Sequence, residues 1–335
     1  MSVLTPFVLG ADVGGTKTKM AIASFASGRP VLVKRETYPS RDYRALELIV
    51  DEFMRDVPAI AGACFAVAGP VEDGRAQLTN LPWQLEEAAL SGHLGVSARL
   101  INDFAAAGRG IEHLAESDLM TLQPGVPMAR GGRVVVGAGT GLGVGVLTWS
   151  GEGYCAYPSE AGHIDFAPVD AVQDELLRYL RAQFGHVSSE RVLCGPGIPR
   201  LLAFLQESGA GSPTPALVEA MQHGDAAGAI TEFALAQRDE LAVRALDLFA
   251  CAYGAFAGSM ALVTLAHGGV YIAGGIAPRI AAKLTDGTFM RAFRAKGRFQ
   301  ELLGSIPVHV VMNEHVGLYG ALAEAARAAL SPRTP

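Results

Sequence analysis

The stretch from Arg133 to Leu147, RVVVGAGTGLGVGVL, decides how the rest of the sequence is interpreted. Three consecutive valines lead into a run in which every second residue is glycine, and a second apolar segment follows. This pattern predicts a strand, a glycine turn and another strand. Glycine lets backbone N–H groups gather around an anion without a Cβ in the way, and Thr140 adds a hydroxyl donor. The stretch therefore predicts a phosphate-binding hairpin.

A second copy of the pattern lies near the start of the chain, where Phe7 to Phe25 reads FVLGADVGGTKTKMAIASF. It also joins two apolar segments through a turn of glycine and threonine. Each copy is followed by an apolar segment that ends in glycine and proline, FAVAGP at Phe65 to Pro70 and YIAGGIAP at Tyr271 to Pro278. These repeated segments predict a duplicated α/β fold with one phosphate hairpin in each half.

Two other phosphate-binding motifs do not fit these loops. The P-loop needs lysine directly after glycine, but Thr16 precedes Lys17 here. The dinucleotide fingerprint needs glycine at its sixth position, which counted from Gly139 is Val144. An ordinary glycine hairpin without a ligand remains the alternative for either loop taken alone.

Length and charge narrow the classes of function. The chain has 335 residues, enough for two domains, because single cores stop growing near about 250–300 residues. Its net charge of −6 and lack of a basic run argue against nucleic-acid binding, which needs a face that neutralises phosphates. The four cysteines are widely spaced and form no Cys-x-x-Cys pair, as expected of reduced thiols in a cytoplasmic protein without a zinc site. No signal peptide is expected, since Asp12 interrupts the first apolar stretch.

One apolar segment is long enough to cross a membrane. Leu248 to Ala266 contains 19 uncharged residues, with Gly254 and Gly258 in Gly-x-x-x-Gly spacing. Much of it is Ala, Gly, Ser and Thr, and no basic residues bracket it. A buried helix that packs closely on its neighbours is the favoured interpretation.

Residues with possible chemistry follow a short predicted strand, Val96 to Ile101. Asn102 and Asp103 come at its carboxyl end, where ligands gather in open α/β sheets. An Asn-Asp pair is also common at a helix N-terminus, with its side chains held by the amides of the first turn. The two roles are compatible, and the sequence alone leaves both open.

A second group of polar residues follows the Arg133–Leu147 hairpin. Glu160 and His163 have the i, i+3 spacing of metal ligands on bundle helices, but Pro158 and Gly162 disfavour a helix, so a loop is expected. Taken alone, His163 is more simply a core histidine. Glu190 follows Ser188 and Ser189, which predict a capped helix start where an acid pairs with the helix dipole. Residues from about 206 to 226 are rich in Gly, Ser and Pro and are expected to form a surface loop.

Taken together, these segments resemble the bacterial ATP-dependent glucokinase family of actin-like, hexokinase-type sugar kinases. The resemblance extends from Phe7 to about Leu330, and it rests on several motifs in the right order, none of them decisive alone. They are GADVGGT, TNLPW, INDFAA, GAGTGLG, PSEAGHIDFAP, HVSSERVLCGPG, GGVYIAGGIAPR and KGRF. The related sugar kinases and repressors with a zinc loop need closely spaced cysteines after the Glu-x-x-His element, and this sequence has none there.

The resemblance implies an α/β fold of two actin-like, ribonuclease H-like domains with mixed sheets flanked by helices, and an active site in the cleft between them. Residues 1–110 are expected to form the smaller domain, with a C-terminal helix near 315–330 packing back on it. Residues 111–330 are expected to form the larger domain with a helical insertion. The implied partners are glucose, MgATP and a second copy of the chain, without nucleic acid or membrane, in the cytoplasm.

The family roles carry over to particular residues. Asp103 resembles the catalytic base that accepts the proton of the sugar 6-hydroxyl, and Asp12 is expected near magnesium, through water. The residues implied to bind sugar are Asn102, Asp103, Glu160, His163 and Glu190. Those implied to bind nucleotide are Asp12, Gly14, Gly15, Thr16, Gly139, Thr140, Gly141, Gly274 and Gly275.

The implied activity is transfer of the γ-phosphoryl group of ATP to glucose, giving glucose 6-phosphate in glycolysis. Sugar kinases with another hexose acceptor or a polyphosphate donor remain alternatives, because these residues do not rank epimers. A non-catalytic sugar-sensing regulator is a third possibility, and the presence of Asp103 argues against it.

Overall fold

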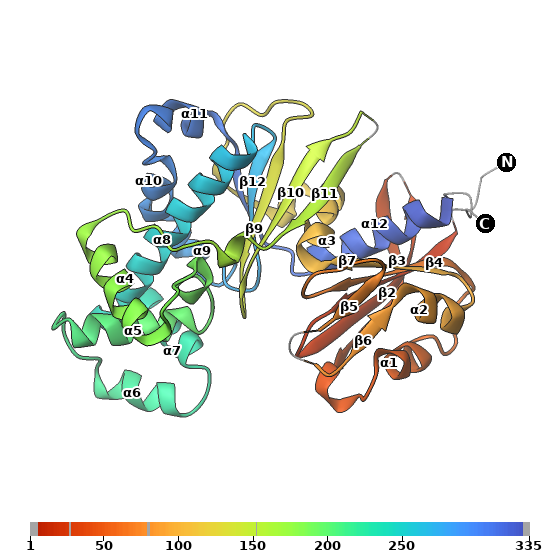
Figure 1. Cartoon of the computed structure of the whole chain (residues 1–335), viewed down its shortest axis with the longest axis horizontal. Coiled ribbons are helices and arrows are strands. Elements are labelled where there is room, and N and C mark those ends of the chain that lie inside the picture. The colour runs from red at the N-terminus through yellow and green to blue at the C-terminus, as the bar shows by residue number, and fades with distance from the viewer. Residues whose placement is uncertain (1–5, 27, 79–80, 152, 331–335) are drawn as a thin grey trace. The chain divides into compact units, whose positions relative to one another are not determined.

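The computed structural model describes residues 6–26, 28–78, 81–151 and 153–330. The chain divides into two compact units (Figure 1). Unit 1 contains Met1–Asp118, Gly153–Pro158 and Asn313–Pro335, and unit 2 contains Leu119–Glu152 and Ser159–Met312. Thr79 and Asn80, which begin the TNLPW motif, lie outside the described residues.

Unit 1 contains a mixed sheet with strand order β3-β2-β1-β4-β7. The first hairpin is antiparallel, whereas β1, β4 and β7 run parallel to one another. The strands are β1 (Phe7–Val13), β2 (Lys17–Ala26), β3 (Arg29–Pro39), β4 (Ile60–Val67) and β7 (Ser97–Asn102). A separate small hairpin joins β5 (Arg75–Gln77) and β6 (Gln84–Glu86).

The strands β1 and β4 are buried on both faces, because alternate residues point to opposite sides and helices cover each side, whereas β3 is largely exposed. Leu9 packs in one apolar cluster with α1 (Leu46–Phe53) and α2 (Glu87–Leu94). Val8 packs in a second cluster with α12 (Val316–Leu330) and α3 (Asp103–Gly110).

Glycines allow α12 to approach α3 and the sheet closely. A Cβ at Gly320 would lie 1.7 Å from the carbonyl oxygen of Ala106 in α3, and one at Gly110 would lie 1.9 Å from that of Val316. Both obstacles are backbone atoms, which no side-chain rotation can move. The close packing of α12 on α3 therefore depends on glycine in both helices.

Unit 2 contains the strand order β10-β9-β12-β13-β8. The second hairpin is antiparallel, and β12 lies parallel between β9 and β13. The strands are β8 (Leu119–Gln123), β9 (Arg133–Ala138), β10 (Leu142–Trp149), β12 (Gly269–Ala273) and β13 (Val308–Val311), and β11 (Tyr154–Ser159) spans the boundary between the units.

Helix α8 (Glu240–Thr264) is the central helix of unit 2. Within the described residues it alone is long and apolar enough to cross a membrane, but 72% of its apolar window is buried in the protein. A Cβ at Gly254 or Gly258 would lie 2.1 or 2.3 Å from a carbonyl oxygen of α10 (Thr288–Arg294). The Gly-x-x-x-Gly spacing therefore serves helix packing inside unit 2.

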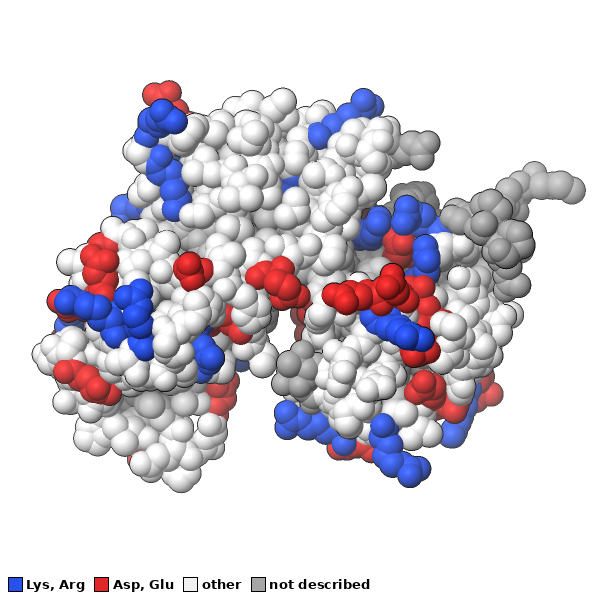
Figure 2. Space-filling view, viewed as in Figure 1, with Lys and Arg blue, Asp and Glu red and all other residues white. Residues whose placement is uncertain are grey.

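The remaining helices surround these sheets. They are α4 (Ala171–Phe184), α5 (Gly197–Glu207), α6 (Pro215–Gln222), α7 (Ala226–Leu235), α9 (Ala281–Thr285) and α11 (Gln300–Ser305). Short 3₁₀ turns cover Ser40–Asp42 (η1), Ile111–His113 (η2), Glu116–Asp118 (η3), Ala161–His163 (η4), Ser189–Arg191 (η5) and Gly297–Phe299 (η6). On the face shown in Figure 2, acidic and basic side chains are intermixed and no broad basic surface is visible.

The structure corrects three expectations. The expected loop at 206–226 contains α6, whose N-terminus has Thr214 as cap and Pro215 in the first turn. The expected helix start at Ser188 is only the 3₁₀ turn η5, and the next helix begins at Gly197. The expected domain boundary at 110 also differs, because residues 111–118 continue from α3 through η2, which packs on α12 in unit 1.

Candidate functional site

Hydrogen bonds from neighbouring residues fix the backbone of the first hairpin turn. The Gly14 amide donates to the Lys17 carbonyl (3.0 Å), and the hydroxyl of Ser40 donates to the Gly14 carbonyl (2.8 Å). The Ser40 amide also donates to the Thr16 carbonyl (3.0 Å). Among the described residues, the amides of Gly15 and Thr16 have no acceptor. These two N–H groups are suited to an anion, and Ser40, which sequence reasoning missed, positions them.

Asp12 lies at the end of β1, in register with Lys19 on β2. Its side chain has no hydrogen-bond partner within the described part of the chain. Burial raises the pKa of Asp12, and the positive charge of Lys19 opposes that shift. Lys19 itself binds Glu314, with 3.2 Å between Nζ and Oε2. A carboxylate that accepts no hydrogen bond from the described residues is a suitable acceptor for the water shell of a cation.

Replacing Asp12 with asparagine is expected to stabilise the fold while it lowers activity. The raised pKa means that ionised Asp12 costs folding free energy, and this cost grows as pH rises through the folded-state pKa. At pH 7 to 8 the Asn variant should therefore unfold at a higher temperature than the original chain. Calorimetry from pH 4 to 8 should show this gain shrinking towards acid, and a gain independent of pH would contradict the explanation.

Three parallel strands of unit 1 end in register at one edge of the sheet. Val13 on β1 aligns with Val67 on β4, and Val67 aligns with Asn102 on β7. Asp12 and Asp103 are adjacent in sequence to the two outer members of this row. The edge is the carboxyl end of the parallel strands, where ligands bind in open α/β sheets.

Asn102 is a helix cap in this structure. Its Oδ1 accepts hydrogen bonds from the amides of Phe104 (2.9 Å) and Ala105 (3.1 Å), and its Nδ2 donates to the Gly69 carbonyl (3.1 Å). The half-buried Asp103 accepts a bond from Phe104 at 2.9 Å. The capping interpretation of the Asn-Asp pair is therefore confirmed for Asn102, which also fixes the first turn that carries Asp103.

The second hairpin turn is joined to two other loops of unit 2. The carbonyl of Gly139 accepts from the Gly195 amide (2.7 Å), and the carbonyl of Ala138 accepts from the Ile276 amide (3.2 Å). Gly274 has φ +83°, and a Cβ there would lie 2.4 Å from the Ala138 carbonyl oxygen. Glycine is therefore required at 274, and the Gly274-Gly275 turn lies directly beside the hairpin.

The polar residues expected to bind sugar in unit 2 gather around Leu142, at the start of β10. Glu190 accepts a hydrogen bond from the Leu142 amide (2.9 Å). A Cβ at Gly162 would lie 1.9 Å from the Leu142 carbonyl, so the η4 turn rests directly on this strand. Glu160 precedes that turn and His163 is its last residue, with 4.0 Å between Oε2 and Nε2, and both side chains are more than half exposed.

Gly141 leaves room for the Glu190 carboxylate. A Cβ there would lie 2.4 Å from Oε2 of Glu190. The structure therefore brings Gly141, Glu160, His163 and Glu190 together in unit 2. The sequence pattern alone predicts that Glu190 pairs with a helix dipole. In the structure its carboxylate instead binds the Leu142 amide, just after the second hairpin turn.

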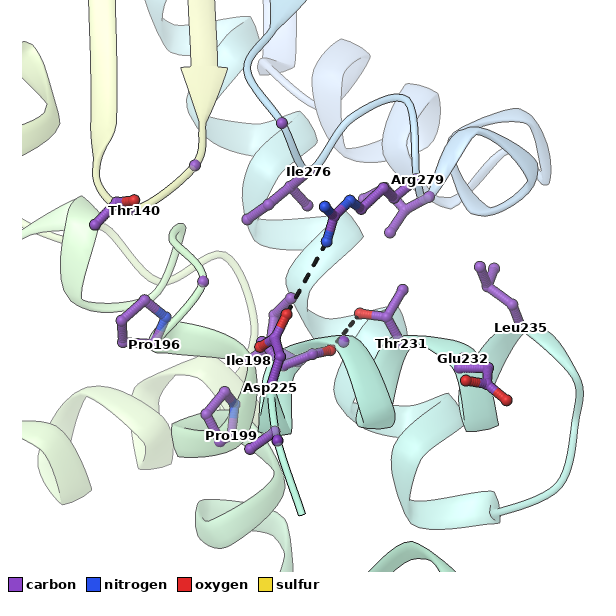
Figure 3. A pocket seen from close by; sticks show the side chains of 18 residues that line it. Thr140, Pro196, Ile198, Pro199, Asp225, Thr231, Glu232, Leu235, Ile276 and Arg279 are labelled. Atoms are coloured by element: carbon purple, nitrogen blue, oxygen red, sulfur yellow. Dashed lines mark hydrogen bonds and ion pairs between the residues drawn. The ribbon is translucent and has the colours of Figure 1, made fainter. Parts of the chain in front are cut away.

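A cavity of about 830 Å³ opens beside this hairpin in unit 2 (Figure 3). Gly139, Thr140 and Gly275 lie at its edge, and Ile198, Ile276 and Leu235 give it apolar walls. Its charged lining residues are Asp225, Glu232 and Arg279. A cavity with apolar walls beside a glycine hairpin is suited to a nucleoside carrying phosphates.

The sequence did not reveal most of this cavity. Its wall includes α7 and the residues just before it, in a region that was expected to be partly loop. Gly195, Pro196 and Gly197 entered the sequence analysis only as the end of the HVSSERVLCGPG motif. No local pattern shows that these segments meet the hairpin, because the contacts span more than 50 residues of sequence.

Comparisons with known proteins agree over nearly the full chain. Residues 9–328 match the glucokinase family. The glucokinase of Nostoc punctiforme is 40% identical over 337 residues, covering 96% of this chain and 99% of its own, and that of Yersinia enterocolitica is 37% identical, covering 95% and 96%.

Solved structures show the same relationship. The crystal structure of glucokinase from an Antarctic psychrotroph has a TM-score of 0.85 and 31% identity, covering 96% of this chain and 99% of its own. A ROK family glucokinase from Streptomyces griseus, in complex with glucose and AMPPNP, shares the fold with a TM-score of 0.62 at 22% identity, covering 96% and 99%. With a family match and full-length relatives of this identity, the chain belongs to the glucokinase family.

Proposed function

We propose that this chain is an ATP-dependent glucokinase of glycolysis. It transfers the γ-phosphoryl group of MgATP to the 6-hydroxyl of D-glucose, and the products are glucose 6-phosphate and ADP. The observation that carries the proposal is the position of Asp103, at the carboxyl end of β7 and in the first turn of α3. Membership of the glucokinase family supports the choice of sugar and donor.

Asp103 acts in this proposal as the general base. Its carboxylate accepts the proton of the 6-hydroxyl while that oxygen forms a bond to the γ-phosphorus, and the bond from the γ-phosphorus to the bridging oxygen of ADP breaks. The transition state is loose, so catalysis depends on positioning and on neutralising charge. The Phe104 amide and the Asn102 cap hold Asp103 for this role.

Sugar recognition is assigned to Asn102, Asp103, Glu160, His163 and Glu190. Carboxylates and amides bind vicinal hydroxyls, and a site built to satisfy several hydroxyls rejects analogues that lack them. The exposed side chains of Glu160 and His163 support this role. Asn102 and Glu190 already bind backbone groups, so they would serve both the fold and the sugar.

Nucleotide binding is assigned to both hairpins and the turn after β12. The residues are Asp12, Gly14, Gly15, Thr16, Gly139, Thr140, Gly141, Gly274 and Gly275. Among the described residues no group of three or more His, Cys, Asp or Glu side chains is placed to hold a metal. Mg²⁺ bound by phosphate oxygens and water needs no such group, and Asp12 would contact its water shell. When bound, Mg²⁺ neutralises phosphate charge.

Glu190→Gln tests the sugar assignment in unit 2. The amide side chain can still accept the hydrogen bond of the Leu142 amide, but it removes a charged acceptor for hydroxyls. We expect KM for glucose to rise about 10-fold or more, with a smaller change in KM for ATP, because charged hydrogen bonds contribute about 1.5–3 kcal/mol. Steady-state kinetics with both substrates varied would measure this. An unchanged KM for glucose would contradict the assignment.

The proposed activity can be separated from its alternatives by one substrate panel. ADP release would be measured with glucose, mannose, fructose, N-acetylglucosamine or no sugar, and phosphorylation would be repeated with polyphosphate as donor. We expect turnover with glucose and MgATP to exceed every other combination. A preferred mannose or polyphosphate reaction would change the assigned specificity, whereas sugar binding without any turnover would indicate a regulator.

The proposal also includes a cytoplasmic location and a homodimeric state, both implied by the family resemblance. Light scattering of the purified protein would test the homodimeric state. A mass near twice 35.0 kDa would support the dimer.

A further inference from the structure

An ion pair crosses the cavity beside the second hairpin. Arg279 extends from the segment after the Gly274-Gly275 turn, and its Nη1 lies 4.0 Å from Oδ2 of Asp225 (Figure 3). Asp225 belongs to the opposite wall, directly before α7. The cation therefore lies within the space assigned to the nucleotide, and it faces a carboxylate there.

Asp225 occupies a position where its side chain would ordinarily bind the helix. It is the N-cap residue of α7, yet its carboxylate accepts no hydrogen bond from the first-turn amides. Asp170, Thr214 and Asp239 each make that bond at the start of another unit 2 helix. The carboxylate of Asp225 is thus left for Arg279 across the cavity.

The pair is weak enough for a ligand to displace. The side chains of Arg279 and Asp225 are 73% and 67% exposed, and 4.0 Å is a long contact. Exposed ion pairs of this kind contribute about 0–1 kcal/mol. Phosphate oxygens match the planar guanidinium at least as well as a carboxylate does. A nucleotide in the cavity can therefore compete for Arg279.

We propose that Arg279 binds the phosphate chain of the nucleotide, and that Asp225 holds it when no nucleotide is bound. This inference rests on the proposed function, because it takes the cavity to be the ATP site. Among the described residues that line the cavity, Arg279 is the one cation, beside the two acidic residues Asp225 and Glu232. Nucleotide binding then exchanges one partner of Arg279 for another, so Asp225 weakens the affinity that Arg279 provides.

The test is direct binding of ADP and adenosine, measured by calorimetry on the full chain. Asp225→Asn should tighten ADP binding about two- to fivefold, because it releases Arg279 and removes a negative charge. Asparagine is as good an N-cap residue as aspartate, so α7 should be retained. Arg279→Gln should weaken ADP binding about threefold to thirtyfold. Neither change should move adenosine binding by more than about twofold, because adenosine lacks phosphates.

Two further variants separate this exchange from a general effect of charge. Glu232→Gln removes the same charge from the same cavity, but Glu232 pairs with Arg238 at 3.4 Å, so its effect should be smaller than that of Asp225→Asn. In the Arg279→Gln background, Asp225→Asn should no longer tighten ADP binding. The effects of the two substitutions on ADP affinity would then be non-additive, which measures the coupling between the two positions.

Equal tightening by Glu232→Gln and Asp225→Asn would overturn the proposal. So would an Asp225→Asn variant that binds ADP no better than the original chain, or a benefit that persists without Arg279. These results differ from failure of the proposed function, in which the original chain would bind no ADP or would phosphorylate no glucose. If the original chain is an active kinase and both Asp225→Asn and Arg279→Gln leave ADP affinity unaltered, the role of Arg279 is rejected while the proposed function stands.

Discussion

Asp103→Asn is expected to lower the turnover number by roughly 10²–10⁴-fold, the usual contribution of a general base. Asparagine can still hydrogen-bond a sugar hydroxyl, but it does not accept the proton of the 6-hydroxyl. We therefore expect the dissociation constant for glucose to change much less than turnover. Initial rates at saturating MgATP, together with glucose calorimetry, would measure both quantities.

The structure makes this variant suitable because Asn102, and not Asp103, caps α3. Loss of the Asp103 carboxylate should leave the helix in place. Asp56→Asn is the matched control, since Asp56 is an exposed carboxylate of unit 1 at φ 57°, a conformation that asparagine tolerates. The control should retain full activity. An Asp103→Asn enzyme with near-normal turnover would show that another group accepts the proton.

Of the variants proposed for this protein, Gly320→Ala is expected to lower the free energy of unfolding most. A new Cβ would lie 1.7 Å from the Ala106 carbonyl oxygen, so α12 must move away from α3. Overpacking of this kind costs about 3 kcal/mol, and the unfolding temperature should fall by roughly 5–10 °C. Because α3 carries Asp103, turnover should also fall. Calorimetry and initial rates would record the two effects.

Gly317→Ala is the matched control on the same helix. Its Cβ would meet only Oδ2 and Cγ of Asp12, at 3.7 and 3.8 Å, which is ordinary contact. Alanine favours a helix over glycine by about 1 kcal/mol, so this variant should be as stable as the original chain or more so. Equal unfolding temperatures for the two variants would contradict the packing explanation.

The local parts of the fold could be predicted from the sequence. The two hairpins and the strand before Asn102 depend on short-range apolar patterns and glycine turns, and the structure has strands at each of these places. Helix α6 was missed, although Thr214 followed by Pro215 is a helix start signal, because the composition of the surrounding residues suggested a loop.

The candidate site was predicted less completely, and the reason is physical. Asp103 and the glycines follow strand ends, which a sequence pattern can locate. The contact of Glu190 with Leu142 joins residues 48 apart, and the Asp225–Arg279 pair joins segments 54 apart. Such pairs are created by packing between elements, which a single sequence does not specify. The roles given to the site residues remain predictions that the variants above test.

³¹P NMR of a reaction containing the protein, glucose and MgATP would observe the proposed phosphoryl transfer itself. We expect the γ-phosphate signal of ATP to decline while signals of ADP and of a phosphomonoester at carbon 6 of glucose rise in equal amounts. Inorganic phosphate should be negligible, because water should not replace the sugar hydroxyl. A phosphomonoester at another carbon, or inorganic phosphate as the main product, would contradict the proposed reaction.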